Sequence, residues 1–534
     1  MVSVRYLING IDTTAFSSNE DIKIVLEENG NKKTVKVKAL NSFTLIDARI
    51  ETSIKIKKDD LMLLNGYQSW TDTVEANLSF KEKNVKKLPK LLNNMFAFDR
   101  YGDTLFYDYN KNKLHGYDVF YIKGMDEYFS FSENYQNAYL VYEINKKEKS
   151  LSLISDCTNV ALNPGDEFTL FDYYEFNSLK EGFDLFYKKH PLLETEKIFG
   201  YTSWYNYYQN INEEIITRDL EGLDSRFNLF QIDDGYESFV GDWLDIDINK
   251  FPNGFKDIVD KIHKKGYKAG IWLAPFVAEE KSKLFKEHPD YFKMQNGAPV
   301  KCGANWSSFY ALDFENEDAK AYIKKCLEYY IDLGFDFFKL DFLYAISLPL
   351  YVGKTRAMVA DSAYAFIKEI LKDKLVLGCG AIPSNCYNRF EYLRIGPDVS
   401  LIFDDVWYMK YMHRERISTK LTLQNTIYRS LFNNHCFLND PDVFLLRDDN
   451  ISLSSKQKEA LLMINSLFGG VLMTSDNIGA YESDQQLLLE EAFELFYLSE
   501  DKSFKKDGIY ILIDYKLNGK QCHLKYNTLK GVME

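Results

Sequence analysis

Hydrophobic and polar residues alternate with a period of two over residues 1–180. The clearest segments with this alternation lie at 22–26, 34–38, 53–56, 138–142 and 168–171. Such alternation is typical of strands with one buried face. The first two segments flank Asn29-Gly30-Asn31, residues that tolerate the positive φ of a hairpin turn. We therefore predict an N-terminal antiparallel β-sandwich over residues 1–180.

The pattern changes after a helix-like segment at 179–189, which is followed by Pro191. Short apolar runs then alternate with longer amphipathic segments, as in repeated β-α units around a parallel sheet. The apolar runs lie at 199–204, 229–234, 268–273, 336–341, 375–380, 393–398, 436–440 and 471–476. We predict a central (β/α)8 TIM barrel over residues 181–498. Alternation returns after it, which predicts a small C-terminal β region at 499–534.

Charged or aromatic residues end almost every predicted strand. In a barrel the carboxyl ends of the strands surround one pocket, whereas a doubly wound sheet binds its ligand at a single switch point. The side chains expected in this pocket are Asp233, Asp234, Lys339, Asp341, Arg394 and Asp398, with Trp204 and Trp272 beside them. Carboxylates and cations without histidines suit a neutral, hydroxylated ligand, and two carboxylates are the minimum machinery for cleaving a glycosidic bond. These residues predict a glycosidase.

The strand at 336–342 carries the clearest chemistry. Lys339 and Asp341 are two positions apart, so their side chains lie on one face of the strand. The ammonium favours an ionised Asp341, as a nucleophile requires. A structural ion pair is the alternative at these positions. A Schiff-base lysine is disfavoured, because the carboxylate stabilises the charged form of Lys339.

Composition and charge exclude several classes of protein. The 534 residues carry a net charge of −14, which argues against nucleic-acid or anionic-membrane partners and favours a neutral small-molecule substrate. The amino terminus has no signal pattern, and no apolar run is long enough to span a membrane, so we expect a cytoplasmic protein. The seven cysteines and seven histidines are scattered. Their spacing predicts no metal site, and we expect no cofactor.

The predicted barrel resembles the retaining α-galactosidases of glycoside hydrolase family 36, in the clan shared with families 27 and 31. The motifs that carry the resemblance appear in the family's order: Ser203-Trp204-Tyr205, Ile232-Asp233-Asp234-Gly235-Tyr236, Gly241-Asp242-Trp243, Lys250-Phe251-Pro252-Asn253-Gly254, Gly270-Ile271-Trp272-Leu273-Ala274-Pro275-Phe276, Lys339-Leu340-Asp341, Leu377-Gly378-Cys379-Gly380, Arg394-Ile395-Gly396-Pro397-Asp398 and Leu438-Asn439-Asp440-Pro441-Asp442. The resemblance implies a double displacement on α-galactosides. Asp341 matches the nucleophile, and Asp398 matches the acid/base.

The resemblance also implies a set of substrate contacts. Asp233 and Asp234 would hold O4 and O6 of galactose, and Lys339 would contact O3 or O4. Arg394 and the Cys379-Gly380 segment would lie near O2. The remaining substrate-binding residues that it implies are Trp272 in the pocket wall, Trp204 and Tyr205, and Trp70 on a loop of the N-terminal domain that caps the site.

Several alternatives stay open at the level of sequence. A raffinose-synthase-like transglycosylase shares the nucleophile. An α-N-acetylgalactosaminidase would differ in the pocket wall near O2, and an α-glucosidase at the Asp233-Asp234 pair. A sugar-binding protein without turnover is disfavoured, because both carboxylates are present. Asp404-Asp405 is a second candidate for the acid/base or, alternatively, a helix start. A nucleophilic thiol at Cys379 is disfavoured for lack of a nearby histidine. The sequence does not determine the natural substrate or the oligomeric state.

Overall fold

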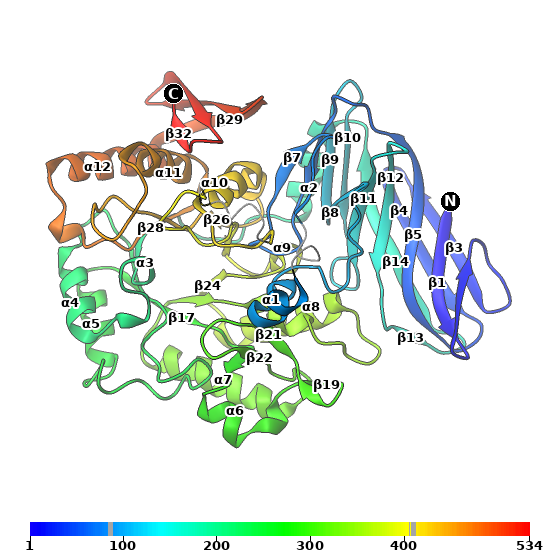
Figure 1. Cartoon of the computed structure of the whole chain (residues 1–534), viewed down its shortest axis with the longest axis horizontal. Helices are drawn as coiled ribbons and strands as arrows, with labels where there is room; N and C mark the ends of the chain where they lie inside the picture. Colours follow the sequence, from blue (N-terminus) through cyan, green and yellow to red (C-terminus); the bar gives the residue numbers. More distant parts are fainter. Residues whose placement is uncertain (84–88, 405, 407–412) are drawn as a thin grey trace.

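The computed structural model of the chain describes residues 1–83, 89–404, 406 and 413–534. Figure 1 shows antiparallel sheets in the N-terminal part, a parallel sheet surrounded by helices, and a small C-terminal sheet. This arrangement confirms the predicted antiparallel N-terminal strands and the predicted parallel central strands. No helix of the described residues is long and apolar enough to cross a membrane.

Two seven-stranded antiparallel sheets form the N-terminal region. The first has the order β2-β1-β5-β12-β11-β8 with β13 beside β5, and consists of β1 (Val2–Ile8), β2 (Ile11–Ala15), β5 (Phe43–Lys55), β8 (Lys113–Tyr117), β11 (Tyr139–Asn145), β12 (Ser150–Asp156) and β13 (Ala161–Leu162). The second has the order β3-β4-β14-β10-β9-β6-β7, and consists of β3 (Ile22–Asn29), β4 (Lys32–Ala39), β6 (Leu61–Leu64), β7 (Val74–Ala76), β9 (Val119–Lys123), β10 (Tyr128–Ser132) and β14 (Glu167–Phe176). Alternate residues such as Val35 and Val37 are fully buried and share a core with Tyr6. The predicted hairpin is confirmed, because Asn29 pairs with Lys32.

The central sheet has the order β26-β25-β24-β23-β17-β16-β15-β28-β27, and its neighbouring strands run parallel. Its strands are β15 (Ile198–Thr202), β16 (Leu229–Ile232), β17 (Lys268–Leu273), β23 (Phe337–Leu340), β24 (Leu375–Gly378), β25 (Tyr392–Arg394), β26 (Leu438–Asp440), β27 (Val443–Phe444) and β28 (Val471–Thr474). β26 and β27 end this order, yet only Pro441 and Asp442 separate them in the chain. The sheet therefore curves until its two ends meet in one stretch of chain.

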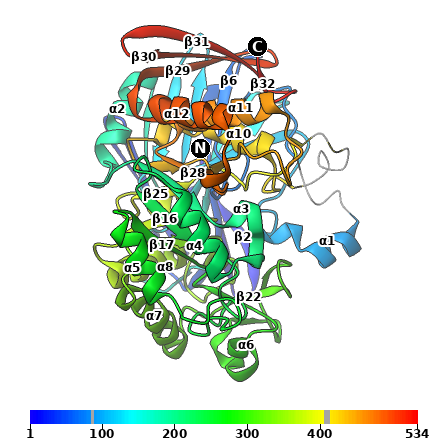
Figure 2. The ribbon, with the colours of Figure 1, turned by 90° about the vertical axis from the view of Figure 1, so that its left-hand side faces the viewer.

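Helices alternate with these strands and cover the outside of the sheet (Figure 2). They are α4 (Glu213–Gly222), α5 (Lys256–Lys264), α7 (Glu317–Asp332), α8 (Arg356–Leu371), α10 (Thr419–Tyr428), α11 (Ser455–Phe468) and α12 (Ser483–Leu498). The helix α2 (Leu179–Lys189) packs instead against β10 and β14 of the N-terminal region, and the short helices α3 (Trp204–Tyr207), α6 (Lys283–Glu287) and α9 (Pro383–Cys386) lie in the connections that follow parallel strands. Side-chain caps define where several of them begin: Asn316 accepts from the first turn of α7, and Ser418 from that of α10. The predicted helix at 179–189 is confirmed as α2.

The C-terminal residues form a four-stranded antiparallel sheet. Its strands are β29 (Ser499–Asp507), β30 (Tyr510–Leu517), β31 (Lys520–Asn527) and β32 (Val532–Met533). Phe504 of β29 packs edge-on against Tyr428 of α10, with ring centroids 5.5 Å apart, and against Phe468 of α11 at 6.2 Å. These aromatic contacts fix the small sheet on the helices around the central sheet.

The parallel strands end earlier than the sequence pattern suggested. β16 ends at Ile232, β23 at Leu340 and β25 at Arg394, whereas the predicted segments reached 234, 341 and 398. The charged residues beyond these ends therefore lie in loops at the edge of the sheet. There the backbone leaves the ladder, and side chains are free to face a cavity.

Candidate active site

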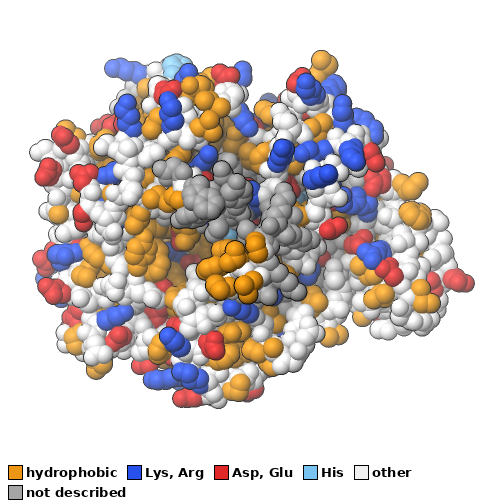
Figure 3. All heavy atoms as spheres, viewed as in Figure 1, with side chains coloured by type: hydrophobic (Ala, Val, Ile, Leu, Met, Phe, Trp, Pro, Cys, Tyr) orange, Lys and Arg blue, Asp and Glu red, His pale blue; other side chains and the backbone are white. Residues whose placement is uncertain are grey.

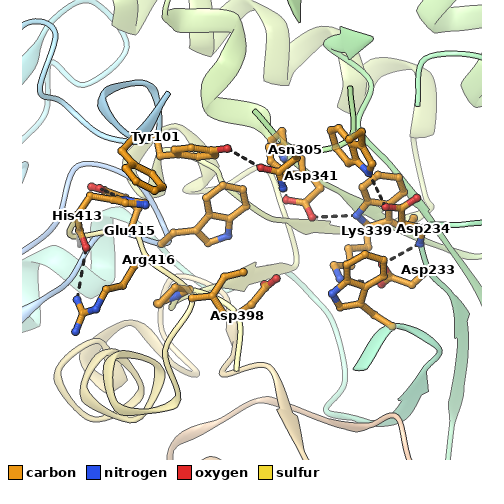
Figure 4. Close-up of a pocket in the computed structure, with 18 residues that line it drawn as sticks. Tyr101, Asp233, Asp234, Asn305, Lys339, Asp341, Asp398, His413, Glu415 and Arg416 are labelled. Carbon is orange, nitrogen blue, oxygen red and sulfur yellow. Dashed lines mark hydrogen bonds and ion pairs between the residues drawn. The ribbon is translucent and has the colours of Figure 1, made fainter. Parts of the chain in front are cut away.

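A cavity of about 280 Å³ lies at the carboxyl ends of the parallel strands (Figure 4). The predicted site residues that line it are Trp70, Trp204, Asp233, Asp234, Trp272, Lys339, Asp341 and Asp398. Asp341 follows β23 and Asp398 follows β25. The fold therefore brings into one cavity two carboxylates that are 57 residues apart in the sequence. Figure 4 shows both of them facing the same space.

Two N–H donors hold the Asp341 carboxylate. Its Oδ2 accepts from Trp272 Nε1 at 2.9 Å, and its Oδ1 accepts from the backbone N–H of Phe342 at 2.8 Å. Phe342 has a φ of 53°, a left-handed conformation that is costly for a residue with a bulky side chain. The turn after β23 therefore adopts a strained backbone conformation, which orients the Asp341 carboxylate.

Lys339 forms its ion pair with Asp233, not with its strand neighbour Asp341. Lys339 Nζ lies 2.8 Å from Asp233 Oδ2, and both side chains are buried. The same oxygen accepts from Gln231 Nε2 at 2.6 Å and from Thr202 Oγ1 at 3.1 Å. Burial is the largest single influence and lowers the pKa of Lys339, but the charge of Asp233 together with the other neighbouring groups, including Asp341, outweighs it, and the pKa is raised. Lys339 is therefore a fixed cation, unsuited to Schiff-base chemistry.

Asp234 faces the cavity from the turn after β16. Gln209 Nε2 donates to both of its oxygens, at 3.1 and 3.2 Å, and Trp306 Nε1 donates to Oδ2 at 2.9 Å. Gln209 belongs to the short helical turn η3 (Tyr208–Asn210), and Trp306 to the loop between β21 (Lys301–Gly303) and β22 (Phe309–Ala311). Burial raises the pKa of Asp234, and these donors oppose the rise. The carboxylate is thus held in place from outside the parallel sheet.

Asp398 shares its cation with two other carboxylates. Arg394 Nη1 donates to Asp398 Oδ1 at 3.0 Å, Arg394 Nε to Asp440 Oδ2 at 2.9 Å, and Arg394 Nη2 lies 2.8 Å from Asp442 Oδ1. Enclosure in the cavity raises the pKa of Asp398, and the nearby Arg394 and Lys339 only partly oppose this. No feature of the sequence indicated why Asp398 would hold a proton, whereas the raised pKa in the folded protein favours the protonated form.

Four residues that we expected to touch substrate do not line the cavity: Tyr205, Cys379, Gly380 and Arg394. The Tyr205 hydroxyl donates to Asp442 behind the wall. Burial raises the pKa of the Cys379 thiol well above its ordinary value, which argues against a nucleophilic thiolate. Gly380 has a φ of 54°, and a Cβ there would lie 3.0 Å from the Trp70 ring. These residues support the site from behind.

The loop that carries Trp70 spans residues 65–73 between β6 and β7. Arg429, at the end of α10, is fully buried and donates to the carbonyl oxygens of Gly66, Gln68 and Ser69 in this loop. Within the described chain, the buried Nε1 of Trp70 has no hydrogen-bond partner. The N-terminal region thus contributes one wall of the cavity and a free donor.

Sequence reasoning missed the outer part of the cavity. The residues there are Phe98, Tyr101, Asn305, Trp306, Phe342, Pro397, His413, Glu415, Arg416 and Ile417. The His413 ring stacks on Tyr101 with centroids 5.5 Å apart and on Phe98 at 4.9 Å, and Thr71 Oγ1 donates to Glu415 at 2.8 Å. These contacts join segments more than 300 residues apart, which no local pattern reveals.

Hydrophobic side chains gather on the same face as this outer wall. Helix α1 (Lys90–Phe96), which directly precedes the cavity residue Phe98, exposes Leu91, Leu92, Met95 and Phe96. Figure 3 shows hydrophobic side chains in this part of the surface. The apolar faces of sugar rings also pack on such side chains, so the surface near the cavity suits a carbohydrate.

Two other sequence-based candidates have a plain outcome. Asp404 forms an ion pair with Arg416 at 2.7 Å and does not line the cavity, whereas Asp405 lies outside the described residues. Among the residues that the structure describes, no group of His, Cys, Asp and Glu side chains is arranged to hold a metal ion.

Comparison with known proteins gives a consistent picture. The family model described as Melibiase matches residues 174–374. "Alpha-galactosidase 1" of Pediococcus pentosaceus is 31% identical over 135 residues, which are 23% of this chain and 18% of the relative. "A type blood alpha-D-galactosamine galactosaminidase" of Flavonifractor plautii is 34% identical over 128 residues, 22% of this chain and 12% of the relative. The aligned regions thus span less than a fifth of either relative's length.

A solved structure matches almost the whole chain. TtGalA, an α-galactosidase from Thermus thermophilus in complex with p-nitrophenyl α-D-galactopyranoside, superposes with a TM-score of 0.72 over 97% of this chain and 98% of its own, at 21% identity. This likeness extends the shared fold beyond the segment matched by the family model. The family model and the curated relatives agree that the central part of the chain is similar to glycoside hydrolases of the melibiase type, and the solved structure shows that the shared fold spans almost the whole chain.

Proposed function

We propose that this chain is a retaining α-galactosidase that hydrolyses terminal, non-reducing α-D-galactosyl residues of oligosaccharides. We interpret its parallel sheet as a (β/α)8 catalytic barrel, because the sheet order begins and ends in one stretch of chain. The observation that carries the proposal is the unequal setting of two carboxylates in one cavity. Asp341 is fixed by two N–H donors, whereas the pKa of Asp398 is raised by its enclosure.

The first half of the reaction breaks the glycosidic bond. Asp398 donates its proton to the departing oxygen while a carboxylate oxygen of Asp341 attacks the anomeric carbon. The sugar is left bound to Asp341 as a covalent galactosyl ester. The hydrogen bonds from Trp272 and from the Phe342 N–H hold Asp341 in position for this attack.

The second half hydrolyses the ester. Asp398, now ionised, takes a proton from water, and the oxygen of that water attacks the anomeric carbon from the face that the leaving group vacated. Galactose leaves with its original anomeric configuration, and Asp341 is regenerated as a carboxylate. Asp398 therefore ends the cycle protonated, ready for the next substrate.

Sugar recognition follows from the remaining charges. Lys339 Nζ uses one donor on Asp233, so two of its three N–H groups are available to hydroxyls in the cavity. We infer that Asp234 accepts from O4 or O6, as the family resemblance implies, and that the free Nε1 of Trp70 donates to the substrate. The Trp272 and Trp204 rings would form the apolar walls.

Azide rescue tests the assignment with a stereochemical readout. Asp341→Gly should lose nearly all activity on an aryl α-galactoside and regain it with azide, giving β-galactosyl azide, because azide enters from the face that Asp341 occupied. Asp398→Ala with azide should give α-galactosyl azide instead. Asp361→Asn, a change in an ion pair with Arg389 on α8, is the matched control. Glycine-variant activity equal to wild type without azide would end the assignment.

A substrate panel separates the alternatives. Wild type should cleave the aryl α-galactoside faster than the aryl α-N-acetylgalactosaminide or α-glucoside. The similarity to a galactosaminidase makes the second substrate a necessary arm of the panel. Adding raffinose or sucrose as an acceptor distinguishes hydrolysis from transglycosylation, because a transglycosylase would form a larger saccharide at the expense of free galactose.

A further inference from the structure

Glu237 is a buried carboxyl group that the proposed mechanism does not use. It follows Asp234 by three residues in the turn after β16, and only 5% of its surface is exposed. Its Oε2 accepts from the backbone N–H of Gly235 at 3.3 Å. Its carboxyl group lies beside the side chain of Asp234, close enough for the two carboxyl groups to share a hydrogen bond. It therefore lies directly behind a carboxylate that faces the sugar cavity.

A hydrogen bond between two carboxyl groups requires a proton on one of them. Asp234 already accepts from Gln209 and Trp306, and donors of this kind favour its ionised form. Glu237 has no ion pair among the described residues and accepts only from backbone N–H groups. The proton therefore resides on Glu237, whose O–H donates to Asp234.

We propose that Glu237 is a positioning residue, a neutral carboxylic acid whose O–H holds the Asp234 carboxylate in the orientation that receives the hydroxyls of the sugar. This inference rests on the proposed function, because it assigns Asp234 to sugar binding. The Asp234 carboxylate then accepts hydrogen bonds from three side chains on the side away from the sugar: Gln209, Trp306 and Glu237. The remaining lone pairs of the carboxylate face the cavity.

A second cavity of about 250 Å³ lies behind the side chains that bind Asp234. Gln209, Glu237 and Trp306 line it, and Trp306 also lines the sugar cavity. Solvent in the second cavity can exchange the proton of Glu237 without passing the bound sugar. The titratable groups around Glu237 are Asp234, the phenols of Tyr236 and Tyr330, and, across this cavity, Lys250, Glu279 and Lys281.

Electrostatics agrees with a neutral Glu237. Burial raises its pKa well above the ordinary value, and the charge of Asp234 raises it further. As the pH rises toward that pKa, Glu237 loses its proton and two ionised carboxylates face each other. Affinity for galactose should therefore decline on the alkaline side and not on the acidic side of neutrality.

Galactose binding by calorimetry tests the proposal in Glu237→Gln, Glu237→Ala and the matched exposed control Glu280→Gln. The glutamine amide can donate as the acid does, so Glu237→Gln should keep Kd within about threefold of wild type near neutral pH, whereas Glu237→Ala should weaken binding about tenfold. Glu237→Gln should also lack the alkaline decline. Equal loss in both variants, tighter binding by Glu237→Gln, or a steeper alkaline decline in that variant would overturn the proposal.

A double-mutant cycle separates positioning from a general structural role. If Glu237 acts through Asp234, then Glu237→Ala should cost less than about twofold in an Asp234→Asn background. The same loss in both backgrounds would overturn the inference. If Glu237→Ala does not fold, the Kd and alkaline profile of Glu237→Gln decide the question. Failure of the proposed function would look different, because wild type itself would then cleave no aryl α-galactoside.

Discussion

Arg429 joins the end of α10 to the loop 65–73 that carries Trp70, and Arg429→Met should release this loop from the active site. The guanidinium is fully buried and meets no carboxylate within hydrogen-bonding distance among the described residues. It donates to three carbonyls of the loop 65–73 and to the Ile395 carbonyl at 2.9 Å, next to the Arg394 that bonds Asp398. Burial lowers the pKa of Arg429 to about 9, which reflects the cost of enclosing this cation.

The size of the effect follows from these contacts. Each loop carbonyl left buried without a donor costs about 1–3 kcal/mol. At about 1.3 kcal/mol for each of the three loop carbonyls, the loss of donors destabilises the closed loop by about 4 kcal/mol. Methionine carries no charge, so about 1–2 kcal/mol of desolvation cost is removed. The net destabilisation of the closed loop is about 2–3 kcal/mol. Trp70 would then be out of position for most of the time, and kcat/KM should fall about 10- to 100-fold.

Two measurements check this prediction together. Turnover of an aryl α-galactoside gives kcat/KM, and hydrogen exchange reports the protection of amides in the loop 65–73. Arg429→Lys should lie between wild type and Arg429→Met, because one ammonium cannot reach all of the carbonyls. Arg5→Met, at an exposed ion pair with Asp12, is the matched control. Wild-type kcat/KM and loop protection in Arg429→Met would refute the reasoning.

Three further predictions concern the groups around the reacting carboxylates. The pKa of Asp398 is raised and the first step needs its protonated form, so kcat/KM should fall as the pH rises through that pKa. Asp398→Ala should remove this alkaline limb. On substrates with poor leaving groups, the same variant should lose about 10²–10⁴-fold in kcat/KM. A pH profile measured on a natural oligosaccharide and on an aryl galactoside checks both parts, and an alkaline limb that survives in Asp398→Ala would contradict the assignment. Trp272→Phe keeps the ring but removes the 2.9 Å hydrogen bond to Asp341, so kcat should fall about tenfold with a smaller change in KM; an unchanged kcat would show that this donor does not orient the nucleophile. Gly380→Ala places a methyl group 3.0 Å from the Trp70 ring at a φ of 54°, and should cost about 1 kcal/mol of stability together with part of the activity; thermal unfolding and kcat/KM measure the two losses, and a fully active, equally stable variant would mean that the Trp70 loop shifts freely.

Much of the fold could be predicted from periodicity, because a buried face leaves a local record. Alternation located β3 and β4, and the short apolar runs located the parallel strands from β15 to β28. The ends of those strands were predicted too late. Asp233 and Asp341 follow apolar residues without a break in the pattern, whereas Gly396 and Pro397, which precede Asp398, are turn residues that mark the end of β25. Periodicity detects burial and not hydrogen bonding, and Asp233 and Asp341 are themselves buried.

The site was predicted less completely, because its geometry depends on neighbours across the sheet. Alternation placed Lys339 and Asp341 on one face, but Lys339 reaches Asp233, which follows β16, two strands away in the sheet order. Trp306 belongs to an excursion between β21 and β22 and follows no parallel strand. A single sequence gives no register between such segments, so these partners could not be found in advance.

The division of Arg394 among three carboxylates explains how one cavity can hold an acid beside a nucleophile. A cation that paired with Asp398 alone would favour the ionised form of that carboxyl group. Arg394 instead forms ion pairs with Asp440 and Asp442 as well. The pKa of Asp442 is itself raised to about 7. The charge of Arg394 therefore lowers the pKa of Asp398 by less than the enclosure of Asp398 raises it. The carboxylates behind the wall thus set the protonation state of the one in front of it.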